Sequence, residues 1–247
     1  MTRPQSYKEI FELRGTRYDK AMQLHPEARA SEFKELASRL PTAPDFRILD
    51  MPSGGGYLSP YFPSNTNLIA LDSCPTFVNV NSRHKAIIGS SGQLPFRSAC
   101  FDGLVSLAGL HHETNKIGIF KEVHRVLKNG AHFCIADVHA SSNVALFLDT
   151  IVDKYNSLGH QGVYLNNSTL DELSQVGLQI TNAELVNFHW VFANSEELVA
   201  FCRELFGLDN IEPERFLKET VDILGVTQLK KGIGLNWQLI YISGYAD

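Results

Sequence analysis

Several features are missing from this sequence, and each absence excludes a class of protein. Its 247 residues contain no run of about 20 apolar residues, the length that a transmembrane helix needs. The first nine residues lack the apolar core of a secretory signal peptide. The four cysteines lie far apart and form no CxxC pair. We therefore expect a cytoplasmic protein with reduced, mostly buried thiols and no membrane segment.

Runs of like charge are also absent. The net charge is −5 and only 20% of the residues are charged, so we do not expect a surface that follows the phosphates of a nucleic acid. The apolar content of 44% is typical of a globular protein with a substantial core. These properties favour a globular protein without a nucleic-acid partner.

The pattern along the chain predicts one α/β domain. Residues 5–40 are expected to be helical, with a break near His25 and Pro26. Short apolar strands then alternate with helices, which is typical of a parallel sheet covered on both faces. The predicted strands are Arg47–Met51, Asn67–Leu71, Lys85–Ile88, Phe101–Leu107 and Ala131–Val138.

The character of the chain changes after about residue 140. Helices are predicted near 143–158, at 195–206 and at 213–224, with β-rich segments at 180–191 and 236–243. We expect a single domain over residues 1–247. It comprises a helical cap at 1–44, a ligand-binding core at 45–140, and a C-terminal half at 141–247 with a helical insert at about 195–231.

A glycine-rich turn follows the first predicted strand, in the stretch ILDMPSGGGYLSPYF at residues 48–62. Three consecutive glycines allow the backbone to approach a ligand, and Asp72 follows Gly54 by 18 residues, at the end of the next strand. That spacing is suited to an acid that accepts hydrogen bonds from ribose hydroxyls. Pro60 and Pro63 limit the following helix to residues 57–62, and the third glycine of a dinucleotide site is missing. A nucleoside ligand without a pyrophosphate, such as S-adenosylmethionine (SAM), meets these requirements.

Four stretches in order resemble the successive motifs of the class I SAM-dependent methyltransferases, in particular the branch that acts on small molecules. They are ILDMPSGGG, ALDSCP, GSSGQLPFRSACFDGLVSLAGLHH and EVHRVLKNGAHFCIADV, and the resemblance covers about residues 46–138. It implies a Rossmann-like, seven-stranded sheet that is mostly parallel and has antiparallel last strands, with a helical cap. Residues 180–191 and 236–243 would supply the antiparallel edge.

The resemblance also implies a set of SAM-binding residues. Asp50 would organise the turn near the methionine amino group, and Asp72 would bind the ribose. Ser90 stands where the family commonly has an aspartate that bonds the adenine amino group, so Ser90 or its neighbour Ser91 would make a weaker, neutral contact there. Tyr18 is expected either to close over the donor or to be a core aromatic. The remaining candidates are Ser53, Gly54 and Gly56 in the turn, Ser73 and Cys74 beside the adenine, and Leu107 and Ala108 beside the transferable methyl.

Catalytic candidates follow the fourth and fifth predicted strands. A general base is required only if the acceptor must lose a proton, and His111, His112 and His139 are the candidates, with His112 preferred. The alternative interpretation of each histidine is a loop residue that is hydrogen-bonded to the backbone and has no part in catalysis. His160, in GHQGVYL, is interpreted as part of a glycine turn rather than a lid. No metal site is expected, because the sequence has no HExxH motif and no clustered carboxylates.

These observations predict a SAM-dependent methyltransferase of small-molecule metabolism. Whether oxygen, nitrogen or carbon is methylated stays open, as does the oligomeric state. The alternative, favoured by Ser90 and the prolines, is a catalytically inactive relative that binds a nucleoside or a partner protein. A protein or RNA methyltransferase is disfavoured by the charge.

Overall fold

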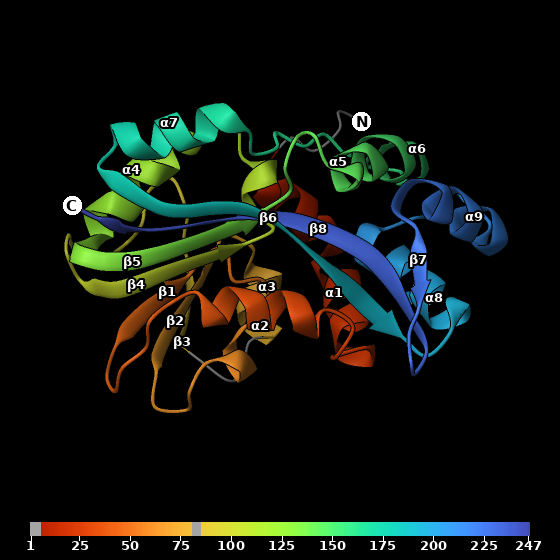
Figure 1. Ribbon diagram of the computed structural model, residues 1–247, viewed down its shortest axis with the longest axis horizontal. Helices are drawn as coiled ribbons and strands as arrows, with labels where there is room; N and C mark the ends of the chain where they lie inside the picture. Colours follow the sequence, from red (N-terminus) through yellow and green to blue (C-terminus); the bar gives the residue numbers. More distant parts are fainter. Residues whose placement is uncertain (1–5, 81–84) are drawn as a thin grey trace.

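The computed structural model describes residues 6–80 and 85–247, and its centre is a twisted β-sheet with helices on both faces (Figure 1). Strand order is β3-β2-β1-β4-β5-β8-β6, with β7 paired to β8. The pairs from β3 to β5 are parallel, and β8 runs antiparallel to β5, β6 and β7. The strands are β1 Arg47–Asp50, β2 Asn67–Asp72, β3 Lys85–Ile88, β4 Phe101–Leu107, β5 Leu127–Asp137, β6 Leu178–Phe192, β7 Val226–Gln228 and β8 Ile233–Ala246.

This topology confirms the predicted Rossmann-like methyltransferase sheet with antiparallel last strands. β7, a three-residue strand beside β8, was not predicted and lies within the helical insert expected at about 195–231, whose last helix ends at Leu224. The predicted strand at residues 131–138 is longer than expected, because β5 begins at Leu127, directly after a helix. The last two strands of the path are also longer than predicted, with 15 residues in β6 and 14 in β8.

Helices surround the sheet and agree with the predicted pattern. A break at residues 25–29 separates the first two, as the sequence indicates. The helices are α1 Tyr7–Leu24, α2 Ala30–Ser38, α3 Pro75–Val80, α4 Lys116–Val126, α5 Asn143–Phe147, α6 Asp153–Tyr155, α7 Asn167–Gln175, α8 Ser195–Phe206 and α9 Pro213–Leu224. The chain also forms 3₁₀ turns at Ser59–Tyr61 and Leu110–His112, and a π-helical turn at Leu148–Val152.

The two faces of the sheet bury separate apolar clusters. Ile48 and Val105 belong to the cluster beneath α2, α5, α8 and α9, whereas their strand neighbours Leu49 and Leu104 belong to the cluster beneath α4 and α7. Because successive side chains of a strand point to opposite faces, a run of apolar residues fills both layers. These near-continuous apolar strands are what the sequence shows between residues 47 and 138.

The N-terminal helices cover the carboxyl ends of the first parallel strands (Figure 1). Helix α1 begins with a capping box, in which the Ser6 side chain accepts from the Glu9 amide and the Glu9 side chain accepts from the Ser6 amide. Helix α1 packs against α3 and also against α8, which comes from the C-terminal part of the chain. Helix α1 therefore closes the edge of the sheet at which ligands of this architecture bind.

In the described ranges, 6–80 and 85–247, no helix combines the length and the apolar character that crossing a bilayer requires.

Candidate functional site

The glycine turn lies between the ends of β1 and β2, where the sequence places it. The Ser53 amide donates to the carbonyl of Leu71 at 2.9 Å, which ties the turn to β2. Gly54 and Gly56 have φ angles of +52° and +76°, a conformation that is strained for residues with a side chain. The turn then passes into the single 3₁₀ turn Ser59–Tyr61 instead of a full helix, as the prolines predict.

Asp50, at the end of β1, is a buried carboxylate with an unused oxygen. The residue is 2% exposed, and its Oδ2 has no hydrogen-bond partner among the residues that the structure describes. Burial, together with the charge of Asp72, raises the pKa of Asp50 to about 8. A buried acid without donors is costly, so this carboxylate is suited to a cationic or hydrogen-donating ligand.

Asp72, at the end of β2, has its carboxylate occupied by donors from the protein. Oδ2 accepts from the Gly54 amide and from the Tyr7 hydroxyl, both at 2.8 Å, and Oδ1 accepts from the Cys74 amide at 2.8 Å. Burial raises the pKa of Asp72, and these hydrogen bonds act in the opposite direction. Tyr7 comes from α1, and no local pattern in the sequence predicts this contact across 65 residues. The carboxylate that is expected to bind the ribose is therefore in place, but donors of the protein occupy its oxygens.

A cavity opens beside this turn, and we call it the turn cavity. It lies where α1, α2 and α3 meet the ends of β1 and β4. Of the predicted SAM-binding residues, it is lined by Tyr18, Asp50, Ser53, Gly54, Leu107 and Ala108, and its other walls include Tyr7, Phe11, Arg29 and Phe77.

A second cavity, the histidine cavity, adjoins the first. The two share a wall made of Phe11, Tyr18, Arg29 and Ala108. The other residues of the histidine cavity come from distant parts of the chain: Arg14, His111, His112, Val138, Leu148, His160, Trp190, Leu205, Phe206, Trp237 and Leu239.

A buried ion pair holds the shared wall in place. The Arg29 guanidinium donates to both carboxylate oxygens of Glu32 and to the Tyr18 hydroxyl. Trp190 donates its indole N–H to Glu32 at 2.8 Å, so the same carboxylate also orients an aromatic wall of the histidine cavity. The charges are fully paired, as a buried ion pair requires.

Aromatic rings and an arginine form one side of the histidine cavity. Trp190 and Trp237 stack at 4.0 Å between ring centroids with an interplanar angle of 22°, and Phe206 lies nearly parallel to both. Arg14, from α1, donates through Nη2 to the Leu205 carbonyl at 2.6 Å. Its buried Nε has no partner within the described ranges, and burial lowers the pKa of Arg14 to about 10. This side suits a flat apolar group that carries a hydrogen-bond acceptor.

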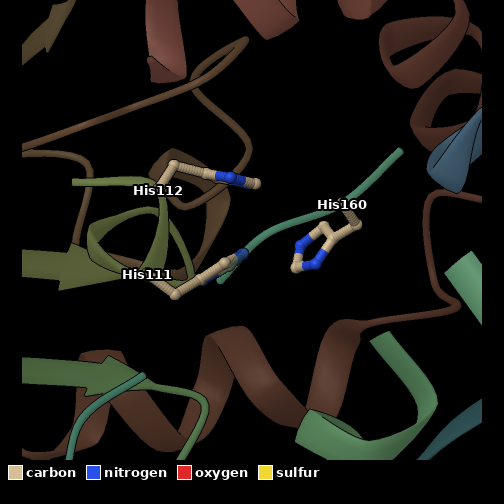
Figure 2. A group of neighbouring side chains, drawn as sticks. All are labelled: His111, His112 and His160. Carbon is tan, nitrogen blue, oxygen red and sulfur yellow. The ribbon is translucent and has the colours of Figure 1, made fainter. Parts of the chain in front are cut away.

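Three buried histidines form the opposite side, and Figure 2 shows their rings directed toward one another. His111 and His112 lie in the 3₁₀ turn after β4, whereas His160 comes from the segment after α6. The His111 Nδ1 is 2.6 Å from Asp137 Oδ1, at the end of β5. Burial lowers the pKa of His112 well below its ordinary value and also lowers that of His160, and the neighbouring histidines add to both shifts.

Other predicted site residues lie away from both cavities. His139 is bonded through Nδ1 to the Ser141 hydroxyl at 2.9 Å and does not line the histidine cavity. Ser90 is exposed, and its Oγ accepts from the Gly92 amide at 3.2 Å. Ser91 is buried, yet like Ser73, Cys74 and Gly56 it lies outside the lining of the turn cavity. Among the candidates for a catalytic base, the structure therefore brings only His111 and His112 to a cavity.

Several lining residues were not singled out as site residues from the sequence: Tyr7, Arg14, Arg29, His160, Trp190 and Trp237. His160 illustrates the reason, because nothing local in GHQGVYL distinguishes a ring that faces His111 from a solvated turn residue. The available signal was that His160, Trp190 and Trp237 are chemically distinctive residues in the half of the chain that supplies the last strands.

Comparisons with known proteins indicate the family and the fold. Residues 49–135 match a family model described as a methyltransferase domain. An uncharacterized methyltransferase of Synechocystis sp. is 32% identical over 111 residues, which are 42% of this chain and 52% of the relative. The match therefore spans about half the length of that curated relative.

Solved structures share the fold. The YcgJ protein from Bacillus subtilis superposes with a TM-score of 0.64 and 18% identity, covering 88% of this chain and 98% of that chain. A SAM-dependent methyltransferase from Thermotoga maritima, described as a possible histamine N-methyltransferase, gives a TM-score of 0.66 at 14% identity, covering 98% of this chain and 100% of that chain. At these identities the likeness establishes the fold.

Proposed function

We propose that the chain is a class I SAM-dependent methyltransferase, as the match of residues 49–135 to a methyltransferase domain indicates, and that it transfers the methyl group of SAM to a small organic acceptor. The observation that carries the proposal is the pair of adjoining cavities at the carboxyl ends of the strands. One is lined by the glycine turn, the other by aromatic rings and histidines, and Ala108 belongs to both. Two molecules that react with each other need such neighbouring sites.

The residues of the turn cavity fit the two ends of SAM differently. The unpartnered Oδ2 of Asp50 suits the ammonium of the methionine end, and Gly54 leaves room for its backbone. The ribose end requires Asp72, whose Oδ2 is bonded to the Tyr7 hydroxyl. SAM therefore fits once Tyr7 gives up this bond, and we propose that the ribose hydroxyls replace it.

When bound, SAM supplies an electrophilic methyl group on its sulfonium. The protein's task is then to align the acceptor and to exclude water. Arg29 holds Tyr18 in the wall shared by the two cavities, and Glu32 holds Trp190 in the wall of the histidine cavity. His111 and His112, on the wall that follows β4, are proposed to contact the acceptor atom that is methylated. His139 has no part in this proposal, because it lies outside the cavity.

The lining of the histidine cavity suggests a class of acceptor. We propose a flat, largely apolar molecule that stacks along Trp237 and carries an anionic or hydrogen-bond-accepting group for the unpartnered Nε of Arg14. Aromatic acids have this chemistry. A panel of aromatic acids and their neutral methyl esters tests it: we expect the acids to bind better, and Arg14→Met to remove the preference while leaving SAM affinity unchanged. A preference for the esters would contradict this acceptor class.

The alternative, an inactive relative, is favoured by the Tyr7–Asp72 bond, because this bond closes the ribose position. The variant Tyr7→Phe distinguishes the two. If SAM must displace the hydroxyl, its loss should tighten SAM binding by roughly tenfold, since a hydrogen bond to a charged group contributes about 1.5–3 kcal/mol. Calorimetry that detects no SAM binding in either protein would favour the relative.

Turnover is the decisive test of the enzyme. Purified protein is incubated with SAM and pools of aromatic acids, and S-adenosylhomocysteine is measured against a control without acceptor. We expect release that depends on the acceptor and on intact Asp50. SAM binding without release in any pool would support a binding protein instead. The cytoplasmic location expected from the sequence, with four buried free thiols, belongs to the same proposal.

A further inference from the structure

The geometry points to a site for a divalent first-row transition metal at His111, His112 and His160, in the wall of the histidine cavity. Each residue offers a ring nitrogen, and the three nitrogens lie within 4.8 Å of one another. Figure 2 shows His160 facing the other two rings across a common space. Metal–nitrogen bonds of about 2.1 Å place two ligands of one ion at most about 4.2 Å apart. Small rotations of the rings therefore suffice to bring the three nitrogens onto one ion.

Asp137 supplies the support that metal-binding histidines commonly have. Its Oδ1 is 2.6 Å from His111 Nδ1, and its other oxygen accepts the His111 amide at 3.1 Å. This fixes Nδ1–H as a donor to the carboxylate and leaves the Nε2 lone pair of His111 as the ligand atom. Asp149 lies farther from His160, with Oδ1 3.8 Å from Nδ1, which is beyond hydrogen-bond distance.

Unused polar atoms in the cluster also indicate a ligand. His112 and His160 are 8% and 7% exposed, and the Nδ1 of each lacks a hydrogen-bond partner among the described residues. Buried polar atoms are nearly always paired, so two orphans on facing rings call for an explanation. A shared metal ion bound by the Nδ1 atoms of His112 and His160 would give both orphans a partner.

The ligand set determines which ion fits. Three imidazoles suit Zn²⁺, Fe²⁺, Co²⁺ or Ni²⁺, whereas Mg²⁺ prefers oxygen ligands. Arg14 and Lys116 bring positive charge near the cluster, and Asp137 and Asp149 bring negative charge, so the ion does not enter a purely cationic environment. Three protein ligands leave a coordination position open toward the cavity, as in catalytic rather than structural sites. If the proposed methyl transfer holds, that position would bind the oxygen or nitrogen of the acceptor.

Metal binding is measured on the full chain without SAM or acceptor, so it is independent of the proposed function. After dialysis against chelator, ZnCl₂ is titrated by calorimetry. We expect one equivalent to bind, and His112→Gln and His160→Gln each to weaken binding by more than about 100-fold. Asp137→Asn should weaken it by about 10–100-fold, because its role is to orient His111. MgCl₂ should give no binding at this site.

His139→Gln is the matched control, since His139 follows the neighbouring strand and lies outside the cluster. It should bind Zn²⁺ like the wild type. Co²⁺ gives a second measurement on the wild type, where visible absorption bands of three-nitrogen coordination should appear and disappear on addition of Zn²⁺. Absence of Zn²⁺ binding by the wild type, or equal binding by the His112 and His160 variants, would overturn the site. In that case lost turnover in those variants would mean that the histidines act on the acceptor directly.

Discussion

The turn cavity and the histidine cavity adjoin each other but are built in different ways. Much of the turn cavity comes from one contiguous stretch between Asp50 and Leu58. The histidine cavity collects single residues from Phe11 to Leu239. The first is thus a local motif on a strand end, and the second exists only after the last strands and α8 have packed against the N-terminal helices. In this molecule the proposed donor site can be recognised in the sequence, whereas the proposed acceptor site depends on the whole fold.

If the two cavities bind different molecules, substitutions in the turn cavity should alter SAM binding, and substitutions in the histidine cavity should alter turnover of the acceptor. His112→Gln, in the histidine cavity, should give the largest effect. We expect kcat/KM for the acceptor to fall by about 10²–10⁴, whether the ring acts on the acceptor directly or through a metal. SAM affinity, measured by calorimetry, should stay close to wild type, because His112 does not line the turn cavity.

His139→Gln provides the control for that change, with near-wild-type turnover expected. Equal losses in both variants would mean that the histidine cavity is not where the acceptor binds.

Asp72→Ala, at the end of β2 beside the glycine turn, should weaken SAM binding by about 100-fold. The substitution removes the acceptor for two ribose hydroxyls, and each bond to a carboxylate contributes about 1.5–3 kcal/mol. It also leaves the Gly54 and Cys74 amides without their partner, so the free energy of unfolding should fall by about 1–3 kcal/mol per buried donor. Asp171→Ala, on the exposed surface of α7, is the matched control. Unchanged SAM affinity in folded Asp72→Ala protein would refute the ribose assignment.

These two predictions show what the sequence does and does not contain. Asp50, Gly54 and Asp72 were identified because turn chemistry and spacing along adjacent strands are local signals. β3 and β4 and helices α8 and α9 were predicted with their observed bounds for the same reason. The Tyr7–Asp72 bond was not, since it depends on where α1 docks, and no local pattern encodes that position.

The histidine cluster was missed for a related reason. Ligands at close spacing along the chain are a local signal, whereas His160 comes within reach of His111 across nearly 50 residues of chain. β7 escaped prediction because three residues carry too little periodicity to identify a strand. Tertiary packing, not local propensity, determines these features.

A third prediction concerns Asp50 and pH. Its pKa of about 8 in the folded protein lies above the ordinary value near 4, so the folded state binds more protons than the unfolded state between these two pH values. The free energy of unfolding of the unligated protein should therefore decrease as pH rises from about 4 to about 8, with this decrease complete above the folded pKa. Asp50→Asn should remove that contribution and, by losing the charge opposite the SAM ammonium, weaken SAM binding by about tenfold.

Chemical denaturation of both proteins at pH 5.5 and pH 8.5 measures the effect. The wild type should lose stability relative to Asp50→Asn on going to the higher pH. Parallel behaviour of the two proteins would show that the Asp50 carboxyl is not held protonated by its burial.

The smallest effect is expected at Ser90. The family resemblance predicts that Ser90→Asp keeps or tightens SAM binding, because a charged acceptor bonds the adenine amino group more strongly than a neutral one. In the structure Ser90 is exposed and its Oγ accepts from the Gly92 amide, a bond that aspartate can also accept. We therefore expect calorimetry to show a change of less than about twofold. A large gain would mean that this loop closes on the adenine when SAM binds.

The most direct test of two adjoining sites is a crystal structure of the protein with S-adenosylhomocysteine. We predict the ligand in the turn cavity, with its amino group at Asp50, its ribose at Asp72, the Tyr7 hydroxyl released from that carboxylate, and its sulfur facing the wall at Ala108. Ligand bound elsewhere, or an intact Tyr7–Asp72 bond beside an empty turn cavity in crystals grown at saturating ligand, would contradict the account.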